Sequence, residues 1–203
     1  MQPRRWRGCD GDNRMLSENE FVVLNAIYLK KMATAATISD ITSLAPDEVS
    51  ERLARAQQAE QIIALPDGAM LLPAGTQAVL EFYHRQYAGI RAEPQTVHWY
   101  ENFETLNSRF IAAVTDWQRS EGDERVERKL LQCAERLSKD IGALVPKVTR
   151  YAEYVRRFER SMDRVDQGQR DYVCKPTIDS VHNIWFEFHE DILAVLGRPR
   201  DTT

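Results

Sequence analysis

The stretch TISDITSLAPDEVSERLARAQQAEQII, residues 37–63, decides the fold. Thr37 or Ser39 suits the cap of a short helix, and residues 44–46, Leu-Ala-Pro, make a turn into a second helix whose first position suits Pro46. The apolar residues of the second helix then recur at helical spacing: Val49, Leu53, Ala56 and Ala59. Two helices joined by a short turn predict a helix-turn-helix.

The flanking segments add one helix before this stretch, and a hairpin and a helix after it. Ser17-Glu-Asn-Glu20 is a capping box that opens the first helix. Residues 62–65 and 69–72 are apolar runs around Pro66-Asp-Gly68, and Asp-Gly between apolar runs indicates a two-stranded hairpin. Residues 73–76 then lead into a helix that carries four apolar residues: Val79, Leu80, Phe82 and Tyr83.

The order helix, helix, helix, hairpin, helix over residues 16 to 92 resembles the winged-helix domain of the MarR family, including the Leu72-Pro-Ala-Gly75 entry into the helix after the hairpin. The resemblance implies that the hairpin is a wing. It also implies that the helix from Pro46 can read duplex DNA.

The second half of the chain contains four apolar stripes with helical spacing, which predict an antiparallel bundle with short connections. The stripes run through residues 100–117, 126–141, 148–165 and 181–196. The expected protein is therefore mainly α, with a winged helix-turn-helix and a two-stranded wing over residues 15–92 and a four-helix bundle over 93–203. Residues 1–14 are expected to be a disordered basic tail, although Arg4-Arg-Trp-Arg7 also suits a minor groove.

Composition narrows the class of function. The 203 residues carry a net charge of -4, and no segment of domain size is basic, which argues against the usual electrostatic footprint of DNA binding. The three cysteines lie far apart without a CxxC pair, so neither a disulfide framework nor a zinc knuckle is encoded. With no apolar run long enough for a membrane span, we expect a cytoplasmic protein without a cofactor, a metal or a membrane partner.

The helix from Pro46 has the wrong charge for a DNA reader. Asp47, Glu48, Glu51 and Glu60 outnumber its two arginines, and the hairpin turn offers no cation. The helix macrodipole accounts for carboxylates in the first turn, but not for Glu51. If the helix does bind DNA, four residues are the expected contacts: Ser50, Arg52, Arg55 and Gln57.

The last helix holds the densest polar pattern. Five polar residues are candidates for one pocket or polar network: Asp116, Asp179, His182, Glu187 and His189. One hypothesis makes His182 an acid or base whose tautomer Asp179 sets, and a metal site would need carboxylates from a facing helix. The simpler interpretation is that both histidines satisfy buried polar groups in the core. The mixed charges over residues 147–164 are typical of a solvated helix face, or of a docking surface for an acidic partner.

The second half also looks similar to a poorly characterised bacterial family, on the basis of residues 106–107, 115–118 and 179–191. That family is loosely associated with enzymes of the phosphoenolpyruvate synthase and pyruvate phosphate dikinase type, and the resemblance implies an accessory or regulatory subunit. The leading hypothesis is a non-catalytic protein that binds a protein partner or a second copy of itself. The alternatives are a MarR-like regulator that binds duplex DNA, and an enzyme or ligand sensor centred on His182.

Overall fold

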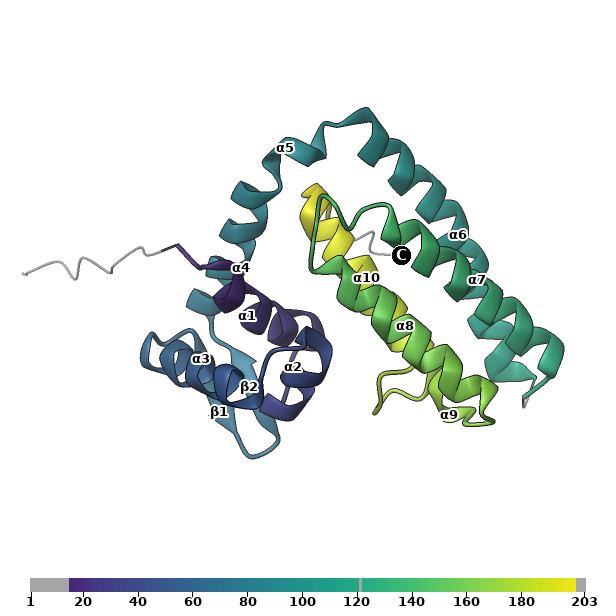
Figure 1. The fold of residues 1–203 in the computed structure, drawn as a ribbon, viewed down its shortest axis with the longest axis horizontal. Helices are drawn as coiled ribbons and strands as arrows, with labels where there is room; N and C mark the ends of the chain where they lie inside the picture. Colours follow the sequence, from purple (N-terminus) through teal and green to yellow (C-terminus); the bar gives the residue numbers. More distant parts are fainter. Residues whose placement is uncertain (1–14, 121, 200–203) are drawn as a thin grey trace, which may run out of the picture.

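The computed structural model describes residues 15–120 and 122–199, and 72% of these described residues are helical (Figure 1). The one sheet of this described part is a two-stranded antiparallel hairpin. The predicted basic tail, residues 1–14, lies outside the described residues. The elements are α1 Glu18–Lys30, α2 Ala35–Thr42, α3 Pro46–Gln58, β1 Ile62–Leu65, β2 Gly68–Leu71, α4 Pro73–Gln86, α5 Ala88–Arg91, α6 Pro94–Arg119, α7 Glu124–Gly142, α8 Tyr151–Asp166, α9 Asp171–Cys174 and α10 Val181–Leu196.

Local sequence signals set the first three helices. The capping box forms as predicted, with the Glu20 amide donating to Ser17 Oγ at 3.3 Å and the Ser17 amide donating to Glu20 Oε2 at 2.9 Å. Pro46 occupies the first turn of α3. The predicted start of α2 was late, because Thr34 rather than Thr37 or Ser39 caps this helix, accepting from the Thr37 amide at 3.1 Å.

Strand β2 of the hairpin forms backbone hydrogen bonds with the segment between α1 and α2. The amide of Ala33 donates to the carbonyl of Ala69 at 3.1 Å, and the amide of Ala69 donates back at 2.8 Å. Gly68 has a φ of +140°, and a Cβ there would lie 2.8 Å from the Ala33 carbonyl, so this corner requires glycine. The outer face of the hairpin consists of exposed apolar side chains: Ile63, Leu65 and Met70.

Helices α6, α7, α8 and α10 cover the four predicted stripes. Consecutive pairs contact one another in the order α6, α7, α8, and α10 lies against α8 (Figure 1). Their shared core includes the Phe110 and Trp185 rings, stacked with centroids 3.7 Å apart, and Trp185 Nε1 donates to Asn107 Oδ1 at 2.9 Å. Helix α9 lies in the connection between the third and the fourth predicted stripe.

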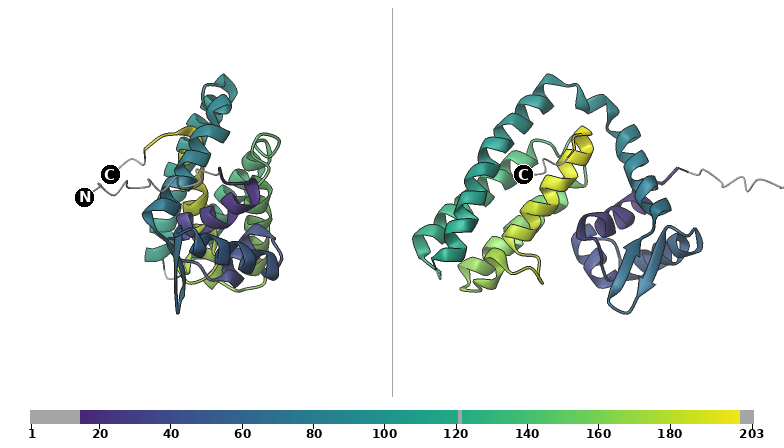
Figure 2. Two further views of the ribbon diagram at one scale, coloured as in Figure 1. Left: turned by 90° about the vertical axis from the view of Figure 1, so that its left-hand side faces the viewer. Right: turned by 180° about the vertical axis from the view of Figure 1, so that it is seen from behind.

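The chain passes from α4 through the short α5 into α6 along the top of the molecule, and α10 returns between α6 and the amino-terminal helices (Figure 2). Helix α1 contacts α10, and α2 contacts α8. Helix α4 also contacts α10, so the amino-terminal helices α1, α2 and α4 meet the later helices along α8 and α10. None of the described helices is long and apolar enough to cross a bilayer.

Candidate functional site

The four residues predicted to contact DNA lie on α3, and three of them form hydrogen bonds or ion pairs within that helix. Arg52 donates to the carboxylate of Glu48 at 2.6 Å and to its carbonyl at 3.0 Å. Arg55 forms an ion pair with Glu51, and Ser50 Oγ donates to the Pro46 carbonyl at 2.8 Å. Gln57 is exposed. Each arginine is therefore neutralised by the glutamate one turn before it, and α3 presents no uncompensated cation.

Two of the five polar residues predicted to form one pocket or polar network are brought together: Asp179 and Glu187 belong to an ionic network between α1, α8 and α10. Asp116 is exposed on α6. His182 stacks near Phe110, with centroids 6.4 Å apart, and burial lowers its pKa below 6.5. His189 lies 3.6 Å from a carboxylate oxygen of Glu104, measured from Nε2. The two histidines thus face α6, and Asp179 interacts with arginines rather than with His182.

The expectation of a solvated face on α8 was wrong for its central arginine. Arg157 is only 3% exposed and donates two hydrogen bonds to Asp179, from Nε to Oδ2 at 3.0 Å and from Nη2 to Oδ1 at 2.6 Å. The same Nη2 donates to Glu187 at 2.6 Å, and Lys30 of α1 donates to the other oxygen of Glu187 at 2.6 Å. Arg160 joins Asp179 to Asp40 of α2.

The charges in this network hold one another in the ionised state. Burial alone would raise the pKa of Asp179, but the hydrogen bonds and charge of Arg157, with Lys30 and Arg160 nearby, lower it below 3.8. Burial alone would lower the pKa of Arg157, and Glu187 and Asp179 raise it instead. Asp179 and Arg157 are therefore charged at neutral pH, and the network ties α1 and α2 to α8 and α10.

A second buried pair lies one turn further along. Asp191 is 1% exposed and pairs with Arg150, while it also accepts from the hydroxyls of Tyr151 at 3.3 Å and Tyr154 at 3.1 Å. Four aromatic rings surround the Arg150 guanidinium at 5.0 to 5.4 Å from their centroids: Phe21, Tyr83, Tyr87 and Tyr151. Burial and the charge of Asp191 raise the pKa of Tyr154, so its hydroxyl remains a donor.

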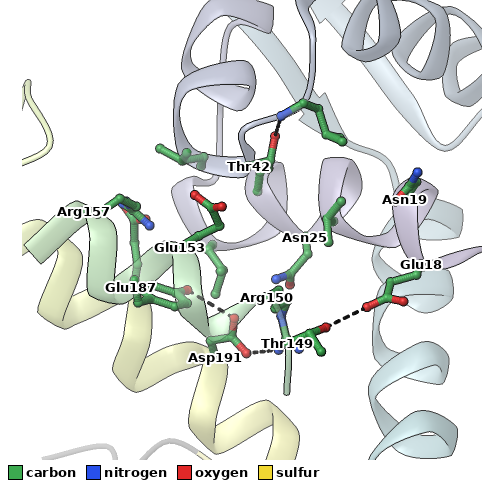
Figure 3. Close-up of a pocket in the computed structure, with 16 residues that line it drawn as sticks. Glu18, Asn19, Asn25, Thr42, Thr149, Arg150, Glu153, Arg157, Glu187 and Asp191 are labelled. Atoms are coloured by element: carbon green, nitrogen blue, oxygen red, sulfur yellow. Dashed lines mark hydrogen bonds and ion pairs between the residues drawn. The ribbon is translucent and has the colours of Figure 1, made fainter. Parts of the chain in front are cut away.

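Between these two ionic groups lies a pocket of about 260 Å³, bounded by α1, α2, α8, α10 and the segment before α8 (Figure 3). One wall is apolar and is formed by Val22, Ala26, Leu29, Ile41 and Leu44. The opposite wall carries Arg150, Tyr154, Arg157, Glu187 and Asp191, and Glu18 and Glu153 also line the pocket.

One hydrogen-bond donor at this pocket is left without a partner. Arg150 Nε is buried and has no partner among the described residues. Asn25 is 4% exposed, and its Oδ1 accepts from the Tyr83 hydroxyl at 2.7 Å. Figure 3 shows the side chains of Asn25 and Arg150 directed toward one another at the pocket.

Sequence reasoning missed Arg150, Arg157 and Asp191 as interacting residues. A signal was present, because Arg150 and Arg157 are seven residues apart and thus lie on one helix face, as do Glu187 and Asp191 at a spacing of four. Pairing the arginine face with the carboxylate face would have predicted that these two helices contact each other. Among the described residues no group of three His, Cys, Asp or Glu side chains is arranged to hold a metal ion.

Comparison of the chain with protein-family models, with curated proteins and with solved structures gave no match.

Proposed function

We propose that this is a non-catalytic regulatory or accessory protein that acts by binding another protein. In this proposal α1 to α4 with the hairpin form a winged helix, and α6, α7, α8 and α10 form an antiparallel bundle. The observation that carries the proposal is the internal pairing of both α3 arginines, because a helix that reads DNA needs cations free to replace the counterions of the phosphates.

The exposed surface beside α3 has the chemistry of a protein contact. Ile63, Leu65 and Met70 on the hairpin are 39 to 45% exposed, and Leu80 on α4 is 45% exposed next to a shallow apolar depression. A wing that enters a DNA groove carries basic side chains, whereas a cluster of aliphatic side chains stabilises a complex when another apolar surface covers it. The face made by α3 and the hairpin is therefore anionic on the helix and apolar on the strands.

The first test is fluorescence anisotropy with labelled duplex DNA between 50 and 300 mM salt. We expect no specific binding by the wild type, and gain of weak, non-specific binding by the Glu48→Gln, Glu51→Gln double variant, in which Arg52 and Arg55 are released. Wild-type binding that falls steeply with salt would overturn the proposal, since that slope reports displaced counterions.

The second test locates the protein contact. A photo-crosslinking amino acid at Met70 on the hairpin is compared in cells with the same amino acid at Lys129, which is exposed on α7. We expect a discrete crosslinked protein from position 70 and none from position 129. Equal crosslinking at both positions, or none at position 70, contradicts a hairpin contact.

A second candidate function is a MarR-like transcription regulator with the bundle as a dimerisation or sensing unit. The order of α1, α2, α3, hairpin and α4 favours it. It predicts specific binding of the wild type to duplex DNA, weakened by Arg52→Ala and by Arg55→Ala. The anisotropy experiment separates the two functions directly.

A further inference from the structure

We propose that the pocket between α1, α2, α8 and α10 binds a small organic cation that has an apolar body and a carbonyl acceptor, the chemistry of an amino-acid amide. This goes beyond the proposed function, which concerns the distant face of α3 and the hairpin. Three features of the pocket carry it: its apolar wall, the carboxylate of Glu18, and the unpaired donor of Arg150.

The size and the apolar wall set the body of the ligand. A volume of about 260 Å³ is just below the roughly 300–1,000 Å³ of sites for drug-sized molecules, so the ligand is a smaller one. Val22, Ala26 and Leu29 of α1 face it together with Ile41 and Leu44. A branched aliphatic group would lose its contact with water against this wall.

The charges select a cation. Four carboxylates line the pocket against two guanidinium groups. The inner two, Glu187 and Asp191, are already paired with Arg157 and Arg150. Of the outer two, Glu153 accepts from Ser43 and forms an ion pair with Arg156. Glu18 is exposed, accepts from Thr149 at 3.2 Å and is not ion-paired within the described residues. An ammonium group is attracted to Glu18, and a carboxylate is repelled.

The unpaired donor selects a carbonyl group. Arg150 Nε is buried without an acceptor, and the Asn25 side chain points toward Arg150 (Figure 3). A buried donor without a partner is unfavourable, and a carbonyl oxygen in the pocket can accept from it. A neutral carbonyl oxygen does so without adding a negative charge beside Asp191 and Glu187.

Such a ligand would touch both parts of the molecule. Its aliphatic group would contact α1 and α2, while its carbonyl group would accept from Arg150, which precedes α8 and pairs with α10. Because the ligand binds the closed arrangement of these four helices, it would stabilise that arrangement. The pocket would then serve as an effector site that reports on a metabolite.

The test uses isothermal titration calorimetry at pH 6.5 with leucinamide and three matched compounds. Isoamylamine keeps the cation and lacks the carbonyl, 4-methylpentanamide keeps the carbonyl and lacks the cation, and 4-methylpentanoate is an anion. We expect leucinamide to bind, each of the first two to bind about tenfold more weakly, and the anion not to bind.

Variants then locate the binding. Ala26→Leu fills the apolar wall and Glu18→Gln removes a carboxylate, so both should weaken leucinamide binding about tenfold or more. Glu159→Gln, on an exposed part of α8 outside the pocket, is the control and should bind as the wild type does. Circular dichroism confirms that each variant is folded.

The proposal is overturned if leucinamide does not bind to the folded wild type at millimolar concentration. It is also overturned if Glu18→Gln and Ala26→Leu, shown to be folded, bind leucinamide as tightly as the wild type. A preference for the anion would reverse the assignment of charge. None of these outcomes depends on DNA binding or on crosslinking at the hairpin, so failure here leaves the proposed function standing.

Discussion

Replacing Asp191 with asparagine should destabilise the protein more than any surface substitution. The change keeps the size of the side chain and removes its charge. Arg150, whose side chain is 11% exposed, then remains buried without an anionic partner. Tyr154 also loses a charged acceptor for its hydroxyl.

The magnitude follows from the burial of the pair. With Asp191 1% exposed, water cannot replace the lost carboxylate, and removing one partner of a buried ion pair costs about 3–5 kcal/mol. For a chain of this length each kcal/mol corresponds to roughly 2–4 °C, so the melting temperature should fall by roughly 6–20 °C. The four rings around Arg150 reduce the loss, because they stabilise the cation to some degree.

Urea unfolding at pH 7, followed by circular dichroism, measures the effect. Asp140→Asn is the matched control, since Asp140 pairs with Arg136 at 2.9 Å on the surface of α7, where Arg136 is 67% exposed. The control should change the free energy of unfolding by at most about 1 kcal/mol. If Asp191→Asn and Asp140→Asn lose the same small amount, Arg150 finds sufficient solvation without its partner, and the reasoning about this pair is refuted.

Three further predictions concern titration, packing and reactivity. Burial lowers the pKa of His182 below 6.5, so the unfolded chain binds the proton more readily, and the free energy of unfolding should be highest above pH 6.5 and decline below it. In urea titrations His182→Gln should flatten this pH profile, whereas an unchanged slope would rule out His182 as its source. A Cβ at Gly75 would collide with the carbonyl oxygen of Gln61, so Gly75→Ala should lower the free energy of unfolding by about 1–3 kcal/mol, while Gly89→Ala, with nothing near its Cβ, should not lower it by more than about 1 kcal/mol. Burial raises the pKa of Cys174 to about 11, so iodoacetamide at pH 8 should label this thiol roughly 100-fold more slowly in the folded protein than in the protein unfolded in urea. Peptide mass spectrometry measures the two rates, and equal rates would contradict the raised pKa.

Signals that act over a few residues predicted much of the fold. The capping box at Ser17, the proline that opens α3 and the Asp-Gly hairpin each depend on neighbours within four residues, and all three lie where the sequence placed them. The four apolar stripes likewise became helices, because a helix that buries one face needs a period near 3.6 whatever it packs against. The start of α2 was misplaced because Thr34, Thr37 and Ser39 are all suitable caps.

The candidate site depended on which helices face one another, and a single sequence does not specify this. Arg157 is flanked by Arg156 and Glu159 in a charged segment that looks solvated, and only the approach of α10 turns it into a buried group. Asp179 and His182 share a helical spacing, yet Asp179 accepts from α8 while His182 stacks near α6. Asp179 lies before the Ser180 cap of α10, outside the helix, so the helical spacing that placed it beside His182 does not apply there.

The two ionic groups also explain how the amino-terminal helices are held in place beside the later ones. An apolar contact can slide by a fraction of a turn at little cost, because dispersion attraction has no preferred direction. Arg157 donates two directed hydrogen bonds to Asp179, and both Arg157 and Lys30 of α1 donate to Glu187. A small shift of α1 would therefore break the charge-assisted hydrogen bond between Lys30 and the buried Glu187. The same contacts form one wall of the pocket. A ligand that accepts a hydrogen bond from Arg150 Nε would therefore bind at the contact that fixes α1 relative to α10. It would change how tightly the amino-terminal helices, which include α3, are held against α8 and α10.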